Sequence, residues 1–446
     1  MSQTPNKTET HTNSRKKPDR PLPERILDNH GTYLAAHLMI WALVAIFYTS
    51  LFSNPLFFSI FIIGMVLVTE GLLAKLKKES DLQVNWTLDS KLLTLSLIVI
   101  ALALPLVYRF NGDDTGIFYY SAAHVTYVLY LLSRTDQLLK GQLSDWLVWD
   151  LVRGLLTYPF RQLFAGPAMF VSKRKANQDA IQWPSIGLVL LSLFFTLPIL
   201  LMVASRLALL SSHFDAFYQY LWHLVAAIPL DLSILSDLFW RAIWAFPITL
   251  YLFGLIVSAT TGPDRQTQAL QWQARLGRYQ VFPSLAIYLL LGGLALVYLI
   301  FALVNLSQVP QLLGQSLSAA QASQVAVPAF WLMVQVALIN LMSIFVTQNL
   351  AQPRLLQTSI YQWLVRILYG ITLVFSCLAA YKLVGLYILG YGLTPLRLLS
   401  AWFVVLVLVF VSLLLLDQFR PLPAWTWAIR YAYISLILVT IIHALL

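Results

Sequence analysis

The stretch SAWFVVLVLVFVSLLLL at positions 400–416 decides the fold of this chain. It contains no charged residue, and apart from two serines every side chain in it is apolar. A helix needs about 20 residues of this kind to cross the hydrocarbon core of a bilayer. Because lipid offers no partner to an exposed backbone N–H or carbonyl group, we predict that this segment crosses the membrane as a helix.

The composition of the whole chain agrees with this stretch. Of the 446 residues, 59% are apolar and only 11% are charged, and the mean hydropathy is +0.74. A soluble domain carries about 25% charged residues. The composition therefore excludes a series of soluble domains and indicates a protein embedded in a bilayer.

Apolar runs of similar length recur along the chain. They predict an all-α, polytopic bundle of about 11 transmembrane helices. The predicted spans are 33–53, 55–74, 92–108, 116–133, 185–204, 238–259, 282–304, 327–347, 360–380, 400–416 and 425–445.

The distribution of lysine and arginine sets the predicted orientation, because cytoplasmic segments of membrane proteins retain an excess of both. With the N-terminus inside and the C-terminus outside, 24 of the 29 basic residues lie on the cytoplasmic side. If segment 217–236 also crossed the membrane, the split would fall to 20 against 9. We therefore expect eleven spans with the N-terminus inside and the C-terminus outside.

The segments between the spans divide the chain further. Residues 1–32 are polar and basic, and we expect a disordered cytoplasmic tail. The first four spans occupy 33–133, and a cytoplasmic connector follows at 134–184. The other seven spans lie within 185–446, with an outer, membrane-hugging segment at 207–237 and a broken segment at 381–399.

The connector contains a candidate surface helix at 142–164, which is too charged to span. Leu147, Leu151, Leu155 and their apolar neighbours share one helical face, and Asp150 and Arg153 lie opposite. This pattern predicts an amphipathic helix on the cytoplasmic membrane surface, and a solvated loop stays the alternative. The basic residues expected to face anionic lipid here are Arg153, Arg161, Lys173, Arg174 and Lys175.

Glu70 lies inside the second predicted span, near its cytoplasmic end. A carboxylate within a membrane is costly and is by default a candidate ion or proton site. Its position about one turn before Lys75, Lys77 and Lys78 favours a second interpretation, in which it reaches out toward water and these lysines.

The broken segment is the most distinctive part of the sequence. Gly385, Gly390, Gly392 and Pro395 interrupt a helical pattern that stays apolar, which predicts a turn embedded in the membrane. Thr394 is placed to cap the next helix, with Pro395 at its first position. Arg397 then lies in the first turn, where a cation opposes the helix dipole. Its expected partner is lipid phosphate or one of the outer carboxylates Asp113, Asp114, Asp215, Asp231 and Asp237.

The same segment carries a family resemblance. It is similar to the LY…YGLTxLR signature of a bacterial polytopic membrane family known as domain of unknown function 4173, which is related to domain of unknown function 4153. The residues that carry the resemblance are Tyr387, Tyr391, Gly392, Leu393, Thr394, Leu396 and Arg397. The resemblance implies a multi-pass protein of a bacterial cell membrane. It supplies no catalytic residue, because that family has no established activity.

Two classes of function stay open. A transporter or channel-like protein is favoured by the number of spans, the broken segment and Glu70. A non-enzymatic, membrane-embedded partner of a sensor or exporter complex is favoured by the few charges within the spans. A lipid-modifying enzyme ranks third, since outer Asp and His residues occur without a motif.

The chain contains none of the HExxH, GxxxxGK[ST], GxSxG, GxGxxG and CxxC motifs. We therefore expect no enzymatic activity, no catalytic residue, no cofactor, no metal site and no nucleic-acid partner. The expected partners are the bilayer, with its anionic lipids at the cytoplasmic face, and another membrane protein.

Overall fold

The computed structural model describes residues 24–50, 54–80, 82, 84–111, 115–172, 232–280, 283–305 and 319–446, together with the isolated positions 216, 219–220 and 223. Every regular element within these residues is helical. The long helices are α2 (His30–Ile46), α3 (Pro55–Glu79), α4 (Leu88–Asn111), α5 (Gly116–Arg134), α11 (Leu232–Thr261), α13 (Ser284–Asn305), α15 (Ala319–Leu350), α17 (Ser359–Ala380), α19 (Pro395–Asp417) and α20 (Ala424–Leu445).

Eight described helices are long and apolar enough to cross a membrane. They coincide with eight of the eleven predicted spans. The predicted spans 116–133 and 282–304 are also helical, as α5 and α13, but they are not among these eight. The predicted span 185–204 and most of the outer segment 207–237 lie outside the described residues.

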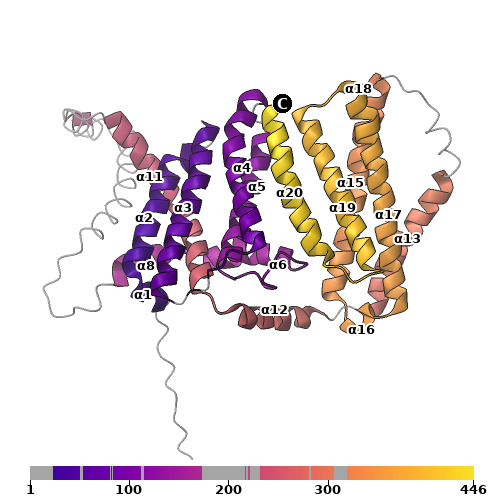
Figure 1. Ribbon diagram of the computed structural model, residues 1–446, viewed down its shortest axis with the longest axis horizontal. Helices are drawn as coiled ribbons and strands as arrows, with labels where there is room; N and C mark the ends of the chain where they lie inside the picture. Colours follow the sequence, from indigo (N-terminus) through magenta and orange to yellow (C-terminus); the bar gives the residue numbers. More distant parts are fainter. Residues whose placement is uncertain are drawn as a thin grey trace, which may run out of the picture.

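The long helices form two groups (Figure 1). In the first group, α2, α3, α4, α5 and α11 share one apolar core, which includes the fully buried side chains of Tyr33, Phe58 and Phe253. In the second group, α13, α15, α17 and α19 share two smaller cores, one around Leu291 and Leu368 and the other around Phe330.

Helix α20 joins the two groups. It packs against α4 of the first group and against α19 of the second. Ile429, Tyr433 and Leu436 of α20 belong to the core of the first group, whereas Ala424 belongs to a core of the second. The contact between the groups therefore depends on this one helix more than on any other described element.

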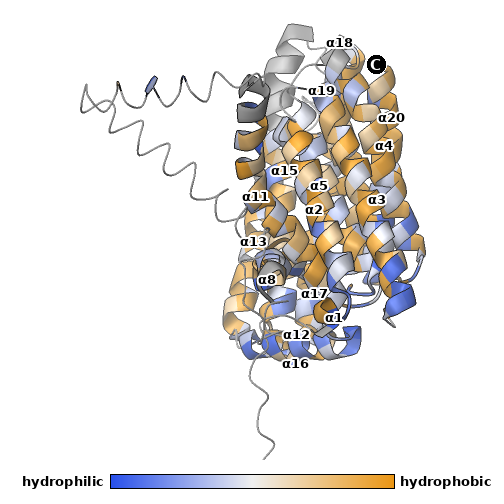
Figure 2. Ribbon diagram, turned by 90° about the vertical axis from the view of Figure 1, so that its left-hand side faces the viewer, coloured by the Kyte–Doolittle hydropathy of each residue, from blue (hydrophilic) through white to orange (hydrophobic). Residues whose placement is uncertain are grey.

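The short helices gather at the two ends of the bundle. Figure 1 shows α1 (Glu24–Asp28), α6 (Leu147–Val152), α12 (Arg265–Tyr279) and α16 (Pro353–Leu356) at one end, here called the α12 end. The C-terminus and α18 (Leu389–Tyr391) lie at the opposite end, here called the α18 end. Hydrophilic residues collect at the α12 end, whereas the middle of the bundle is hydrophobic (Figure 2).

Local signals explain where several helices begin. The side chain of Asn54 accepts the N–H of Leu56 at the start of α3, and Pro55 occupies the first helical position. The side chain of Asp264 caps α12 by accepting the N–H of Thr267 at 3.0 Å. These bonds satisfy backbone donors that have no partner within the helix itself.

The connector departs from the predicted surface helix. It forms α6, a π-helical turn at Arg153–Thr157, α7 (Tyr158–Arg161) and α8 (Ala165–Ser172). Leu147, Leu151 and Leu155 of the predicted apolar face are partly buried against the core of the first group, but the predicted polar residues Asp150 and Arg153 are buried as well. The prediction that Arg153 faces lipid is wrong, because its side chain is enclosed by hydrogen-bond partners from two other segments.

Candidate functional site

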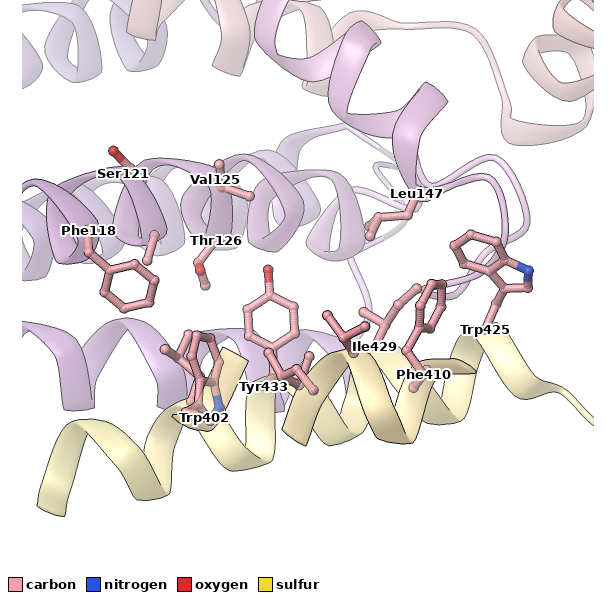
Figure 3. Close-up of a pocket in the computed structure, with 16 residues that line it drawn as sticks. Phe118, Ser121, Val125, Thr126, Leu147, Trp402, Phe410, Trp425, Ile429 and Tyr433 are labelled. Carbon is pink, nitrogen blue, oxygen red and sulfur yellow. The ribbon is translucent and has the colours of Figure 1, made fainter. Parts of the chain in front are cut away.

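An apolar groove lies where the two helix groups meet. It runs between α5, α19 and α20 and has a cavity volume of about 490 Å³. This seam groove is drawn in Figure 3. Its lining residues are Phe118, Ser121, Ala122, Val125, Thr126, Leu147, Trp402, Leu406, Val407, Phe410, Trp425, Ala428, Ile429, Ala432, Tyr433 and Leu436.

Helical spacing places these residues on facing surfaces. The lining positions of α20 are 425, 428, 429, 432, 433 and 436, and those of α5 are 118, 121, 122, 125 and 126. Both sets follow the three-and-four repeat of one helix face. Small side chains at Ala122, Ala428 and Ala432 leave space between helices that bulky neighbours hold apart.

Aromatic side chains close both ends of the seam groove. Phe118 and Trp402 meet with ring centroids 5.7 Å apart, and Phe410 and Trp425 meet edge to face at 4.8 Å. Between these pairs, Tyr433 points across the groove (Figure 3). The indole N–H of Trp402 donates to the hydroxyl of Ser435 at 3.0 Å, which fixes α19 against α20.

A second cavity, of about 500 Å³, lies beside the seam groove at the α12 end. Trp425 lines both cavities, and the adjacent residues Trp146 and Leu147 line one each. This cavity, here called the polar pocket, is lined by Asp145, Trp146, Gln273, Leu276, Gln280, Phe345, Gln348, Asn349, Asp417 and Trp425. An apolar groove thus adjoins a polar pocket at one aromatic residue.

A buried network holds the floor of the first helix group together. Arg153, only 1% exposed, donates to the carbonyl of Gln137 and to Oδ1 of Asp150, and it also bonds Tyr158 and Gln268. Gln268 belongs to α12, so this network ties α12 to the connector. Burial raises the pKa of Asp150 from 3.8 to about 7, although the N–H of Leu139 and the charge of Arg153 both oppose the shift.

Glu70 forms an ion pair with Arg134. Nε of Arg134 donates to Oε1 of Glu70 at 2.7 Å, and a terminal nitrogen donates to Oε2 at 2.6 Å. Arg134 also donates to the carbonyl of Asn85 at 2.8 Å, and its guanidinium lies 3.8 Å from the ring centre of Trp86. Glu70 therefore contacts a buried arginine rather than the three lysines proposed from the sequence. A bidentate pair of this kind positions α3 against α5.

A second ion pair links the first group to α20. Nε of Arg430 donates to Oδ1 of Asp89 at 2.7 Å, and Oδ2 of Asp89 accepts the N–H of Leu143 at 2.9 Å. Asp89 is 2% exposed, so both of its oxygens are satisfied inside the protein. This pair fixes the start of α20 to the start of α4.

The broken segment lies at the α18 end. A π-helix at Tyr381–Ile388 continues α17, and α18 ends at Tyr391. Gly392 has φ of +81°, a left-handed conformation that favours glycine, and it reverses the chain before α19. Pro395 is at the first position of α19, as predicted. Thr394 occupies the N-cap position, but its side chain makes no capping hydrogen bond, so the predicted side-chain cap is wrong.

Arg397 contacts its own segment. It donates to the carbonyl of Gly392 at 2.7 Å and to the hydroxyl of Tyr387 at 3.3 Å, and its guanidinium lies 4.3 Å from the ring centre of Tyr387. Asp237, one of the predicted partners, instead pairs with Arg241 at 2.7 Å. The other predicted carboxylates, Asp113, Asp114, Asp215 and Asp231, lie outside the described residues.

These contacts predict a moderate role for Arg397 in stability. Arg397→Ala should lower the free energy of unfolding by about 1–2 kcal/mol, since it removes a charged donor and a cation–π contact on a half-exposed segment. Arg397→Lys should recover part of the loss, because an ammonium can still reach the Gly392 carbonyl. Thermal unfolding of the purified protein in mild detergent measures both changes. A loss in Arg397→Ala as large as that of a fully buried ion pair would contradict this assignment.

The remaining basic residues expected to face lipid lie in different environments. Arg161 is exposed at the end of α7. Lys173, Arg174 and Lys175 lie outside the described residues. The seam groove and the polar pocket were not predicted, because each includes residues that are more than 200 positions apart in the sequence. The available signal was the recurrence of small and aromatic residues on one face of 425–436.

One of the comparisons with known proteins gives a match. A family model described as a domain of unknown function (DUF4153) matches residues 96–446. No curated protein and no solved structure matches the chain. The match includes all of α5, α19 and α20, which line the seam groove, as well as the broken segment. The resemblance to domain of unknown function 4173 stays a prediction. Since the model matches most of the chain, this protein belongs to the DUF4153 family.

Proposed function

We propose that this multi-pass membrane protein binds a lipid-like amphiphile and acts as a transporter-like carrier for it. The observation that supports the proposal is the junction of the apolar seam groove with the polar pocket at Trp425. An acyl chain fits the groove and a polar headgroup fits the pocket, because each part of the ligand then meets its own kind of surface.

The position of the site supports a lipid source for this ligand. The groove is formed by α5 and by the candidate spans α19 and α20, so acyl chains are the expected neighbours of its opening. The polar pocket lies at the α12 end, where hydrophilic residues gather. Our proposal places the α12 end in the cytoplasm, because Arg134, Arg153, Arg265, Arg275 and Arg278 lie in or next to its elements.

The remaining parts of the proposal follow from the sequence. We propose eleven spans in a bacterial cell membrane, with anionic lipid at the cytoplasmic face. We propose no enzymatic reaction, since the groove and pocket call for binding and release only. A membrane-embedded partner of a sensor or exporter complex is the alternative, and the experiment below separates the two.

The test uses a phospholipid with a photoreactive group on its acyl chain, in vesicles that contain the purified protein. Irradiation should label peptides of α5, α19 and α20, because the chain lies among them. Ala432→Trp should abolish this labelling by filling the groove. Ile434→Trp is the matched control, since residue 434 is on the same helix but 51% exposed.

A second measurement distinguishes a lipid carrier from a partner of a sensor or exporter complex. It follows the movement of a fluorescent phospholipid between the two leaflets of the same vesicles. A carrier should accelerate this exchange, and Ala432→Trp should return it to the rate of protein-free vesicles. Groove labelling without accelerated exchange would favour the partner alternative. Labelling spread evenly over all outward-facing helices would show that the groove holds no amphiphile and would overturn the proposal.

A further inference from the structure

The polar residues that line the polar pocket are either acidic or neutral. Two of them are carboxylates, Asp145 and Asp417, and four are amides, Gln273, Gln280, Gln348 and Asn349. Within the described part of the chain, no lysine or arginine lines this pocket. A headgroup that enters it therefore meets negative charge and neutral amides but no cationic side chain, which disfavours a phosphate or carboxylate.

The two carboxylates differ in how they are compensated. Nζ of Lys140 lies 2.7 Å from both oxygens of Asp145, so that charge is already neutralised. Oδ1 of Asp417 accepts the neutral N–H of Leu422 at 2.9 Å, and Asp417 has no ion pair among the described residues. Asp417 is thus the lining carboxylate that can pair with a cationic ligand.

The position of Asp417 strengthens this negative charge. It is the last residue of α19, where the helix dipole also presents its negative end. The nearby Arg366 donates to the carbonyl of Gln418 at 3.1 Å, and it is not among the lining residues. A cation next to Asp417 would be stabilised by both the carboxylate and the helix terminus.

Aromatic rings complete a site for a positive charge. Trp146 and Trp425 line the pocket, and indole is the ring that attracts a cation most strongly. The ammonium group of Lys140 already lies 5.8 Å from the ring centre of Trp146. The ring of Trp146 therefore already attracts one ammonium group, from a lysine outside the pocket lining.

We propose that the amphiphile bound by this protein carries a positively charged amine in its headgroup, with the amine held by Asp417. This inference rests on the proposed function, because it names the ligand class of the same site. The acyl chain cannot determine which amphiphile is bound, because the lipid tails of the bilayer are as apolar as the groove. Selectivity for one amphiphile must therefore come from the polar pocket.

The test is competition against the photoreactive phospholipid in nanodiscs. Three competitors share one hexadecyl chain and differ in their headgroups: hexadecylamine, hexadecyl glucoside and hexadecyl phosphate. Hexadecylamine should reduce labelling of the groove at about tenfold lower mole fraction than the other two, the size expected for hydrogen bonds to a charged partner. This order of the three competitors is measured in the unmodified protein and does not require any variant.

Two variants locate the effect. Asp417→Asn should remove the preference for hexadecylamine while its melting temperature stays unchanged, because asparagine can still accept the N–H of Leu422. Asp264→Asn is the matched control: it changes an exposed acid outside the pocket, and asparagine also caps helices well. A preference for the glucoside or the phosphate, or an unchanged preference in Asp417→Asn, would overturn the amine assignment and leave the proposed function standing. Absence of groove labelling before any competitor is added would instead remove the proposed function.

Discussion

Arg153→Ala should lower the free energy of unfolding by about 3–5 kcal/mol, because it removes one partner of a buried ion pair and leaves the other without compensation. Asp150 and Arg153 are each 1% exposed in their side chains, and Oδ2 of Asp150 has no hydrogen-bond partner in the described structure. Arg161→Ala is the matched control, since Arg161 lies nearby on an exposed surface and should change stability by less than about 0.5 kcal/mol.

The defect of Arg153→Ala should depend on pH in a defined direction. Burial raises the pKa of Asp150 to about 7, so near pH 6 the carboxyl is largely neutral whether or not Arg153 is present. Near pH 8 the normal protein can ionise Asp150 beside Arg153, whereas the variant must keep the proton or bury an unpaired charge. Because the folded variant then holds a proton that the unfolded chain has released, its stability falls as the pH rises.

Thermal unfolding in mild detergent at pH 6 and at pH 8 measures this difference. The loss caused by Arg153→Ala should be larger at pH 8. The double variant with Asp150→Asn should be less destabilised than the sum of the single variants. An equal loss at both pH values would show that Asp150 keeps one charge state throughout.

Arg134→Ala should have a comparable effect, again about 3–5 kcal/mol. It removes both hydrogen bonds to Glu70, the bond to the Asn85 carbonyl and the stacking on Trp86. Arg134→Lys should recover only a part, because a lysine cannot form the two parallel bonds of a guanidinium.

The measurement is the yield of monodisperse protein after extraction, together with its melting temperature. The pair of Lys75 and Glu79 supplies the control: it is exposed and 4.0 Å long, so Lys75→Ala should cost less than about 1 kcal/mol. If Arg134→Ala left stability unchanged while Glu70→Gln abolished lipid exchange, Glu70 would be a functional site rather than a structural one.

The helices could be predicted from the sequence, but their side-chain partners could not. An uninterrupted apolar run such as 400–416 has one structural solution in lipid, and α19 contains it. Lipid places no such constraint on which side chains a short connector buries. Around 142–164, the polar pair Asp150 and Arg153 is buried together with Leu147, Leu151 and Leu155, because Arg153 bonds both Asp150 and Gln268 from α12.

Sequence separation explains why the partner of Glu70 could not be predicted. Glu70 precedes its partner Arg134 by 64 residues, and the nearby lysines were the only cations that local spacing could suggest. For Arg397, charge alone suggested lipid phosphate or an outer carboxylate, and four of the five carboxylates lie outside the described residues. Charge alone did not indicate the carbonyl of Gly392, five residues earlier, which accepts a hydrogen bond from Arg397. Counting charged side chains cannot identify a backbone carbonyl in a broken helix as the partner of an arginine.

The bridging position of α20 fixes the order in which the site can assemble during protein synthesis. Asp89 precedes its partner Arg430 by 341 residues. At a translation rate of about 5–20 residues per second, α4 emerges roughly 20–70 s before the helix that will pair with it. During that interval Asp89 lacks its arginine, and the seam groove lacks α20 and, for most of the time, α19 as well. The seam groove is therefore completed only when α20, the last described helix to be synthesised, inserts between two groups that are already present.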